Sequence, residues 1–237
     1  MLNTKKYVLF CLILSITVLL SAFGLSQMGN TIAVWQENDP TVPIFVIDPG
    51  HGGEDGGATD SMGRKESEIN LGISLRLRDL LNLMGVRTLM IRGEDRSIET
   101  EGNTIAARKV SDIRNRVRIT NETPNARLIS IHQNYYPEGK YRGAQVFYSP
   151  TPGSQAWAEA LQELLSTQVD PNNHRECKPG RDIYLLDHVQ CPAILVECGF
   201  LSNTEEATLL QEPSYQKRIA TAIACCAISE TENENEV

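Results

Sequence analysis

The amino-acid sequence predicts an α/β fold, with a mostly parallel central sheet and helices on both faces, in a single domain. Short apolar runs alternate with longer segments in which apolar residues recur at helical spacing. The short runs are apolar throughout, which is typical of strands that are buried on both faces of a parallel sheet. Once the first segment is set aside, about 200 residues remain, the size of one domain.

The first 29 residues have the pattern of an export signal. Lys5 and Lys6 precede an uncharged run from Tyr7 to Leu25. This run is also close to the roughly 18–20 residues that span a bilayer, so residues 1–29 are expected to be a signal peptide or an N-terminal membrane anchor. In either case the lysines stay inside, and we expect the remaining chain to be exported.

The first elements of the domain follow from apolar periodicity and chain breakers. Residues 30–43 contain Asn, Asp and Pro and are expected to be a linker, and the first strand begins at Ile44. Residues 64–84 have helical spacing and end before Gly85, a residue that commonly follows a helix. The apolar stretch 86–91 predicts the second strand.

The alternation of helix and strand then repeats. Residues 103–121 are expected to form a helix with Ile105, Ile113 and Val117 facing inward, followed by a strand at 127–132. The same criteria predict strands at 143–149, 182–186 and 192–197, and helices at 154–168, 203–210 and 213–229. Residues 230–237 are expected to be a solvated acidic tail.

Charge and cysteine content argue against nucleic-acid binding, a disulfide framework and a cysteine-ligated zinc site. The net charge is −8, and no basic cluster follows Lys6, so nucleic acid is not expected as a partner. Five cysteines follow the leader, an odd number that includes the adjacent Cys225 and Cys226, which does not indicate a disulfide framework. No Cys-x-x-Cys spacing occurs, so cysteine ligation of zinc is disfavoured and most of the cysteines are expected to be buried.

Three polar side chains stand at the ends of separate apolar strands. His51 follows the first strand, and glycines around it allow a ligand to approach closely. His132 and Glu197 end two later strands. Because sites in parallel sheets form beyond the carboxyl ends of strands, we expect these three residues to lie close together.

His51 and His132 could bind a metal ion, and a third ligand is expected among the acids near His51, namely Glu54, Glu66 and Glu68. At 100° per residue, Glu66 falls within the apolar stripe of its helix, whereas Glu68 points to the opposite side. Catalytic zinc (Zn2+) takes three ligands of this type, so the residues fit a site of His51, Glu66 and His132. The structural alternative is that Glu66 complements the helix dipole.

Glu197 ends a strand that has no other polar side chain. Beside a metal it would act as the catalytic acid/base that takes a proton from water and passes it to a leaving nitrogen. The alternative is a buried acid paired with Arg92 or Arg116. Asn134 would bind substrate or cap a turn, and His174 and His188 lie in polar stretches and are expected at the surface or in loops. No nucleophile elbow and no phosphate-binding loop occurs.

The chain resembles the zinc-dependent N-acetylmuramoyl-L-alanine amidases, and most closely their germination-specific CwlD group in spore-forming bacteria. The resemblance covers residues 44–229 and rests on the segments 47–53, 66–71, 130–134 and 196–203. It implies a zinc amidase catalytic domain in which His51, Glu66 and His132 bind zinc and Glu197 is the catalytic acid/base. It further implies cleavage of the amide between N-acetylmuramic acid and the L-alanine of the stem peptide.

The resemblance also implies partners and a location. Peptidoglycan is the expected substrate, and the CwlD group acts in spore cortex maturation, where muramic-δ-lactam forms. We therefore expect action at the outer face of the membrane or in the cell wall, including the forespore intermembrane space. Some relatives need an activating or targeting protein. The alternatives are a zinc peptidase that cuts within the stem peptide and a non-catalytic peptidoglycan-binding protein of the same fold.

Overall fold

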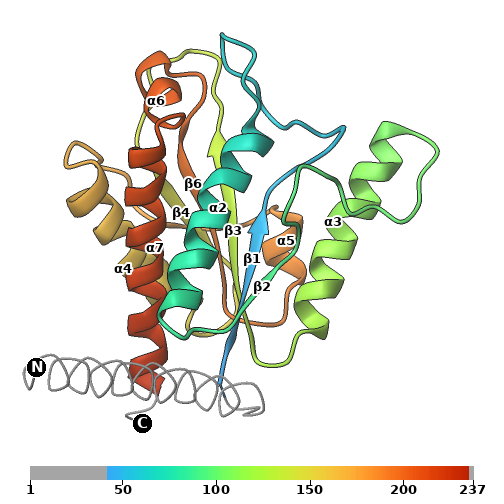
Figure 1. The fold of residues 1–237 in the computed structure, drawn as a ribbon, viewed down its shortest axis with the longest axis vertical. Coiled ribbons are helices and arrows are strands. Elements are labelled where there is room, and N and C mark those ends of the chain that lie inside the picture. The colour runs from blue at the N-terminus through green and yellow to red at the C-terminus, as the bar shows by residue number, and fades with distance from the viewer. Residues whose placement is uncertain (1–41, 235–237) are drawn as a thin grey trace, which may run out of the picture. The chain divides into compact units, whose positions relative to one another are not determined.

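A six-stranded sheet lies at the centre of the part that the computed structural model describes, residues 42–234, with side chains as far as residue 230 (Figure 1). The strand order is β2-β1-β3-β6-β4-β5. The strands are β1 (Ile44–Pro49), β2 (Thr88–Met90), β3 (Ala126–Asn134), β4 (Gln145–Tyr148), β5 (Lys178–Pro179) and β6 (Ala193–Phe200). Strands β2, β1, β3 and β6 are parallel, whereas β4 is antiparallel to β6. The prediction of a mostly parallel sheet is confirmed.

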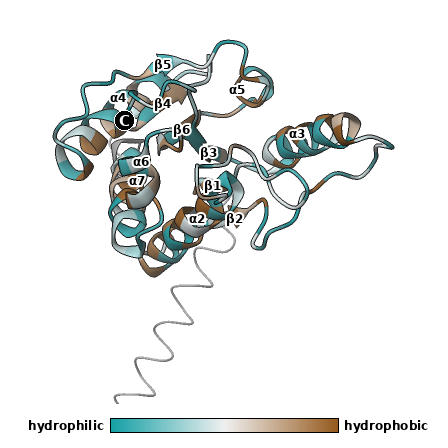
Figure 2. Ribbon diagram, turned by 90° about the horizontal axis from the view of Figure 1, so that it is seen from above, coloured by the Kyte–Doolittle hydropathy of each residue, from teal (hydrophilic) through white to brown (hydrophobic). Residues whose placement is uncertain are grey.

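Helices cover both faces of this sheet, as the end-on view in Figure 2 shows for α2 and α7 on one side and α3 and α5 on the other. The helices are α2 (Glu66–Leu83), α3 (Ile105–Glu122), α4 (Ser154–Leu164), α5 (Tyr184–His188), α6 (Thr204–Leu209) and α7 (Pro213–Glu234). Phe45 and Ile47 of β1 pack in the core with α2, α4 and α7. Val46 packs in the core with α3 and α5. Both faces are therefore apolar, which explains the uninterrupted apolar runs.

The segment 182–186 does not form the predicted strand. It contains the start of helix α5, and β5 lies earlier, at Lys178–Pro179. Asp182 has a left-handed conformation with φ 65°, which turns the chain before the helix. Leu185 and Leu186 are buried in the core with α3, and a short apolar run does not distinguish a strand from a buried helical turn.

Helix α3 differs from the prediction in the exposure of its first residue, and helix α7 extends further toward the C-terminus than predicted. Ile105 was expected to face inward but is 60% exposed, because it is the first residue of α3 and lies beyond the contact of that helix with the sheet. Ile113 and Val117 do pack against the core. Helix α7 continues through residues 230–234, and Glu230 lies 3.7 Å from Arg127 in an ion pair, so the acidic segment begins within a helix.

The predicted leader, 1–29, and the linker up to residue 41 lie outside the described residues. Within residues 42–234, none of the helices combines the length and the apolar character that crossing a bilayer requires. The cysteines of this part are free: Cys198 and Cys226 are buried, Cys177 and Cys191 are partly buried, and Cys225 is exposed. Only two of these five cysteines are fully buried, so the expectation that most of them are buried is wrong.

Candidate active site

His51 lies just beyond the end of β1, in a left-handed backbone conformation with φ 59°. Its Nδ1 atom is 2.8 Å from Oδ2 of Asp55, and its Nε2 atom is 3.4 Å from Oε2 of Glu66. Burial lowers the pKa of His51, but the two carboxylates outweigh this effect and raise the pKa to about 9. A carboxylate on one ring nitrogen fixes the tautomer and directs the other nitrogen toward a metal.

Glu66 is the first residue of α2 and is only 3% exposed. Its Oε1 atom lies 3.0 Å from Nδ1 of His132 and accepts a hydrogen bond from the backbone N–H of Gln133 at 3.1 Å. Its Oε2 atom accepts from the backbone N–H of Ala58 at 2.9 Å. Burial alone would raise the pKa of Glu66, but the hydrogen bonds with His132 and His51 lower it well below the usual range. The buried carboxylate is therefore ionised.

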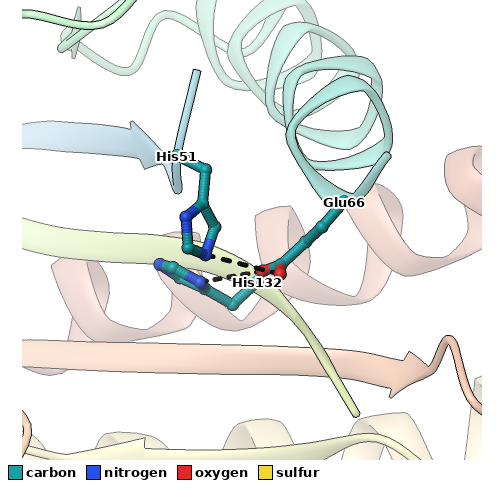
Figure 3. Close-up of side chains that lie close together, drawn as sticks. All are labelled: His51, Glu66 and His132. Carbon is teal, nitrogen blue, oxygen red and sulfur yellow. Dashed lines mark hydrogen bonds and ion pairs between the residues drawn. The ribbon is translucent and has the colours of Figure 1, made fainter. Parts of the chain in front are cut away.

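The three side chains converge from three elements, as Figure 3 shows: His51 from the end of β1, Glu66 from α2 and His132 from β3. One potential ligand atom from each residue lies within 4.8 Å of the others. The rings of the two histidines are 5.1 Å apart between centroids. This arrangement agrees with the expectation that the carboxyl ends of separate strands meet at one edge of the sheet.

Two glycines make room for this convergence. A Cβ atom on Gly50 would lie 2.2 Å from the ring of His132. A Cβ atom on Gly57, which has φ 69°, would lie 2.6 Å from Oε2 of Glu66. Any side chain at either position would displace a member of the cluster.

The donor set fits zinc. Two imidazole nitrogens and one carboxylate oxygen form the common three-ligand set of catalytic zinc sites, which leaves a fourth position for water or substrate. The buried, ionised carboxylate of Glu66 between two imidazole rings is also compatible with a cation, because positive charge stabilises it. His51, Glu66 and His132 are therefore the residues that could hold the metal.

Glu197 lies beside this cluster on β6, directly in register with His132 on β3. Its Oε2 atom is buried and has no hydrogen-bond partner in the described part of the chain. Burial raises the pKa of Glu197 to about 7; the charge of Glu66 raises it further, while His132 and His51 oppose the shift. A carboxylate with such a pKa can accept and release a proton near neutral pH.

The interpretation of Glu197 as half of a buried ion pair is wrong. Arg92 is buried but donates to backbone oxygens, including that of Pro49 at 2.8 Å. Arg116 forms ion pairs with Asp48 and Asp112 instead. Neither arginine forms an ion pair with Glu197, and no lysine or arginine among the residues whose side chains are described does so.

Arg116 also supports the backbone that carries His51. Its Nη2 atom donates to the carbonyl oxygen of His51 at 2.8 Å, and its Nη1 atom donates to that of Pro49 at 2.9 Å. The partner carboxylate of Asp48 accepts in addition from the hydroxyl of Ser130 at 2.7 Å. A buried network therefore connects α3, β1 and β3 directly below the cluster.

Further residues near the candidate site include some that the sequence analysis named and two that it did not. Asn134 lies two residues beyond His132 at the end of β3, whereas His188 stacks on Tyr184 in α5 with ring centroids 3.9 Å apart. Asp55, which orients His51, was missed; its position four residues after His51 in a glycine-rich turn was the available signal. Lys109, whose Nζ atom lies 2.7 Å from Oδ1 of Asp55, gave no signal because α3 is brought there by the fold.

Comparison with known proteins gives consistent matches. Residues 45–229 match the model of a family described as N-acetylmuramoyl-L-alanine amidase. The chain is 39% identical over 184 residues to the germination-specific N-acetylmuramoyl-L-alanine amidase of Bacillus subtilis (strain 168), and the match covers 76% of each chain.

Solved structures of similar fold include the CwlD amidase from Clostridioides difficile in complex with the GerS lipoprotein. That match has a TM-score of 0.76 and 38% identity, and it covers 80% of this chain and 98% of the other. The amidase AmiC2 of Nostoc punctiforme matches with a TM-score of 0.69 and 30% identity over 80% of this chain and 97% of the other.

Proposed function

Because the chain belongs to the N-acetylmuramoyl-L-alanine amidase family and is close to its germination-specific members, we propose that it is an exported, zinc-dependent amidase of the spore cortex. Its substrate is the amide between N-acetylmuramic acid and the L-alanine of the stem peptide in peptidoglycan. The observation that supports this proposal most directly is the convergence of His51, Glu66 and His132 beside Glu197, whose buried Oε2 atom has no hydrogen-bond partner in the described part of the chain.

The residues have separate roles in this proposal. His51, Glu66 and His132 would hold zinc, which when bound supplies a Lewis acid for the scissile carbonyl and an acidified water. Asp55 holds the ring of His51 in the orientation that directs Nε2 toward the site. Glu197 accepts a proton from the attacking water and returns it to the nitrogen of L-alanine as that nitrogen leaves.

Location and partners follow from the same relatives. The uncharged run in residues 7–25 supports export, so the enzyme would act at the outer face of the membrane or in the cell wall. In a sporulating cell this includes the forespore intermembrane space, where removal of the stem peptide would permit muramic-δ-lactam formation. The relative from Clostridioides difficile is in complex with the GerS lipoprotein, which supports an activating or targeting partner for this chain.

The identity of the released amine tests the reaction. Purified protein loaded with zinc is incubated with cortex or vegetative peptidoglycan, and the products are analysed by mass spectrometry. We expect peptides with a free L-alanine amine. Glu197→Gln should reduce turnover by about 100-fold or more while zinc content is unchanged, because the side chain keeps its shape but loses the base. Glu68→Gln, on an exposed face of the same helix as Glu66, is the control and should behave as wild type.

Two results would contradict the proposal. Cleavage between residues of the stem peptide would identify a peptidase instead. Intact muropeptides, with zinc bound and with a partner lipoprotein present, would indicate a peptidoglycan-binding protein without catalytic activity. Zinc occupancy is measured in each case, so that loss of metal is not mistaken for absence of catalysis.

A further inference from the structure

The residues of the site continue in a row across the sheet beyond Glu197. His132 on β3 is in register with Glu197 on β6, and Glu197 is paired with Gln145 on β4. Residues directly opposite each other on adjacent strands project from the same face of the sheet. The side chain of Gln145 therefore continues the row His132, Glu197, Gln145, which we call the site row.

Gln145 positions an arginine at the end of the site row. Its Oε1 atom accepts a hydrogen bond from Nη1 of Arg175 at 2.8 Å. Nε of Arg175 donates to the carbonyl oxygen of Arg142 at 2.8 Å, and the guanidinium lies 4.5 Å from the ring centroid of Phe200. Strands are spaced about 4.8 Å apart, so the guanidinium lies about two strand spacings, roughly 10 Å, from Glu197.

This guanidinium is partly buried and has no carboxylate within ion-pair distance in the part of the chain whose side chains are described. Neighbouring cations on the loop between β3 and β4 are already paired: Lys140 with Glu138 at 2.6 Å, and Arg142 with Asp170 at 3.1 Å. Burial lowers the pKa of Arg175, and the charges of Glu206 and Tyr141 oppose this shift only in part.

The nearby carboxylate of Glu206 does not fill this role. Its Oε1 atom accepts from the backbone N–H of Gly143, and its Oε2 atom accepts from that of Phe200, each at 2.9 Å. Partly buried charges are normally paired. A guanidinium that is fixed in place, unpaired and close to a catalytic site therefore indicates an anionic group on the ligand.

We propose that Arg175 binds a carboxylate of the stem peptide, on the leaving side of the scissile amide. This inference rests on the amidase function proposed above. The lactyl carboxyl of muramic acid is consumed in the scissile amide, so the substrate's free carboxylates lie on the peptide. Two extended residues span about 7 Å. A hydrogen bond of about 3 Å then brings an α-carboxylate on the second residue to Arg175.

The geometry of the arginine suits this ligand. A guanidinium presents a planar fork that matches a carboxylate in two parallel hydrogen bonds. Nε and Nη1 already hold the side chain in place, and Nη2 makes no hydrogen bond to any described residue. Arg175 is thus a specificity residue for the substrate.

A pair of synthetic muramoyl peptides tests the proposal. The two peptides are identical except that the second residue of the stem carries an α-carboxylate in one and a carboxamide in the other. The ratio of kcat/KM for the two is measured with zinc-loaded wild type, Arg175→Gln and Arg142→Gln. We expect wild type to favour the carboxylate by about tenfold or more. This ratio should fall to about one in Arg175→Gln and remain at the wild-type value in Arg142→Gln, whose cation is already paired.

Further measurements separate the possible failures. Thermal unfolding checks each variant, and Arg175→Lys, which keeps the charge but not the fork, should show an intermediate ratio even if Arg175→Gln does not fold. Binding of the two peptides to Glu197→Gln should show the same preference without turnover. Equal ratios in wild type and Arg175→Gln, with both peptides cleaved, would overturn the role of Arg175. Cleavage of neither peptide by wild type, with zinc bound and with a partner lipoprotein present, would overturn the amidase function and this inference with it.

Discussion

Glu66 is the residue on which the candidate metal centre depends. Both histidines approach its carboxylate, His132 at 3.0 Å and His51 at 3.4 Å. Because the pKa of His51 is raised to about 9, this histidine carries a proton at neutral pH when no cation is present. A metal ion that binds His51 must displace that proton, so zinc affinity is linked to pH.

At the residue scale, we predict that Gly50→Ala weakens zinc binding by tenfold or more. The new Cβ atom would lie 2.2 Å from the ring of His132, so the ring must move away from Glu66. Loss of support around a metal ligand typically costs about 10–100-fold in affinity. The dissociation constant is measured by competition with a chromophoric chelator.

Gly93→Ala is the matched control, since a Cβ atom there meets nothing within 4 Å and its backbone is not left-handed. It should bind zinc as wild type does. Equal zinc affinity for Gly50→Ala and Gly93→Ala would show that the position of His132 does not matter for the metal.

Several site residues could be found from the sequence because their signals are local. His51 and His132 stand where apolar runs end, and Glu66 lies on the apolar side of its helix. Asp55 and Lys109 were missed, because their contacts depend on how α3 packs beside the loop after β1. Such packing leaves no pattern along the chain. The roles of the metal ligands and of Glu197 remain predictions until zinc and turnover are measured.

At the scale of the elements, the buried pair of Arg116 and Asp48 joins α3 to β1. Both side chains are almost completely buried, and Asp112 gives Arg116 a second carboxylate at 2.5 Å. Burial raises the pKa of Asp48, but Arg116 and the hydroxyl of Ser130 lower it below its ordinary value of 3.8. The pair therefore fixes the distance between helix and strand only while Asp48 is ionised.

We predict that Asp48→Asn destabilises the fold by about 3 kcal/mol at pH 7, because it leaves a buried guanidinium with one carboxylate fewer. A carboxylate with a lowered pKa in the folded state stabilises the fold above its unfolded pKa, and this stabilisation is lost as the pH falls toward the folded value. The difference between wild type and variant should thus narrow as the pH falls below the ordinary aspartate pKa of 3.8. Urea unfolding at several pH values measures it.

The exposed pair of Asp79 and Arg78 provides the control for this series. Asp79→Asn should change the unfolding free energy by well under 1 kcal/mol at every pH. A constant difference between wild type and Asp48→Asn across the acid range would show that ionisation of Asp48 does not stabilise the fold.

Most elements were predicted close to their observed bounds, including the short β2, β4 and α6, whereas β5 and α5 were not. Helix α2, with apolar residues at regular spacing, begins and ends within two residues of the prediction. The two-residue strand β5 is too short to leave a pattern. Leu185 and Leu186 of α5 can be buried in a strand or in a helical turn, so tertiary packing decides the secondary structure of this segment.

At the scale of the whole molecule, we predict that removing zinc leaves the domain folded. The two apolar cores lie on the faces of the sheet, while the metal cluster lies at its edge, so the core does not depend on the cation. With free zinc at about 100 times the dissociation constant, binding stabilises the fold by about 2.7 kcal/mol. For a domain of this size the Tm should rise by roughly 5–10 °C.

Calorimetry with zinc and with a chelator measures this shift, and near-ultraviolet circular dichroism checks the packing of the apo protein. A cooperative transition without zinc is the expected result. An apo protein with no cooperative transition would show that the metal is part of the folding core, as it is in small zinc domains.

The chain enters the domain at the end of the sheet opposite the candidate active site. Pro43 directly precedes β1, whose six residues span about 20 Å, and His51 lies beyond the other end of that strand. A segment joined to the domain before Pro43 is therefore attached at the amino-terminal ends of the parallel strands. The end of the sheet that carries His51, Glu66 and His132 is free of this attachment point.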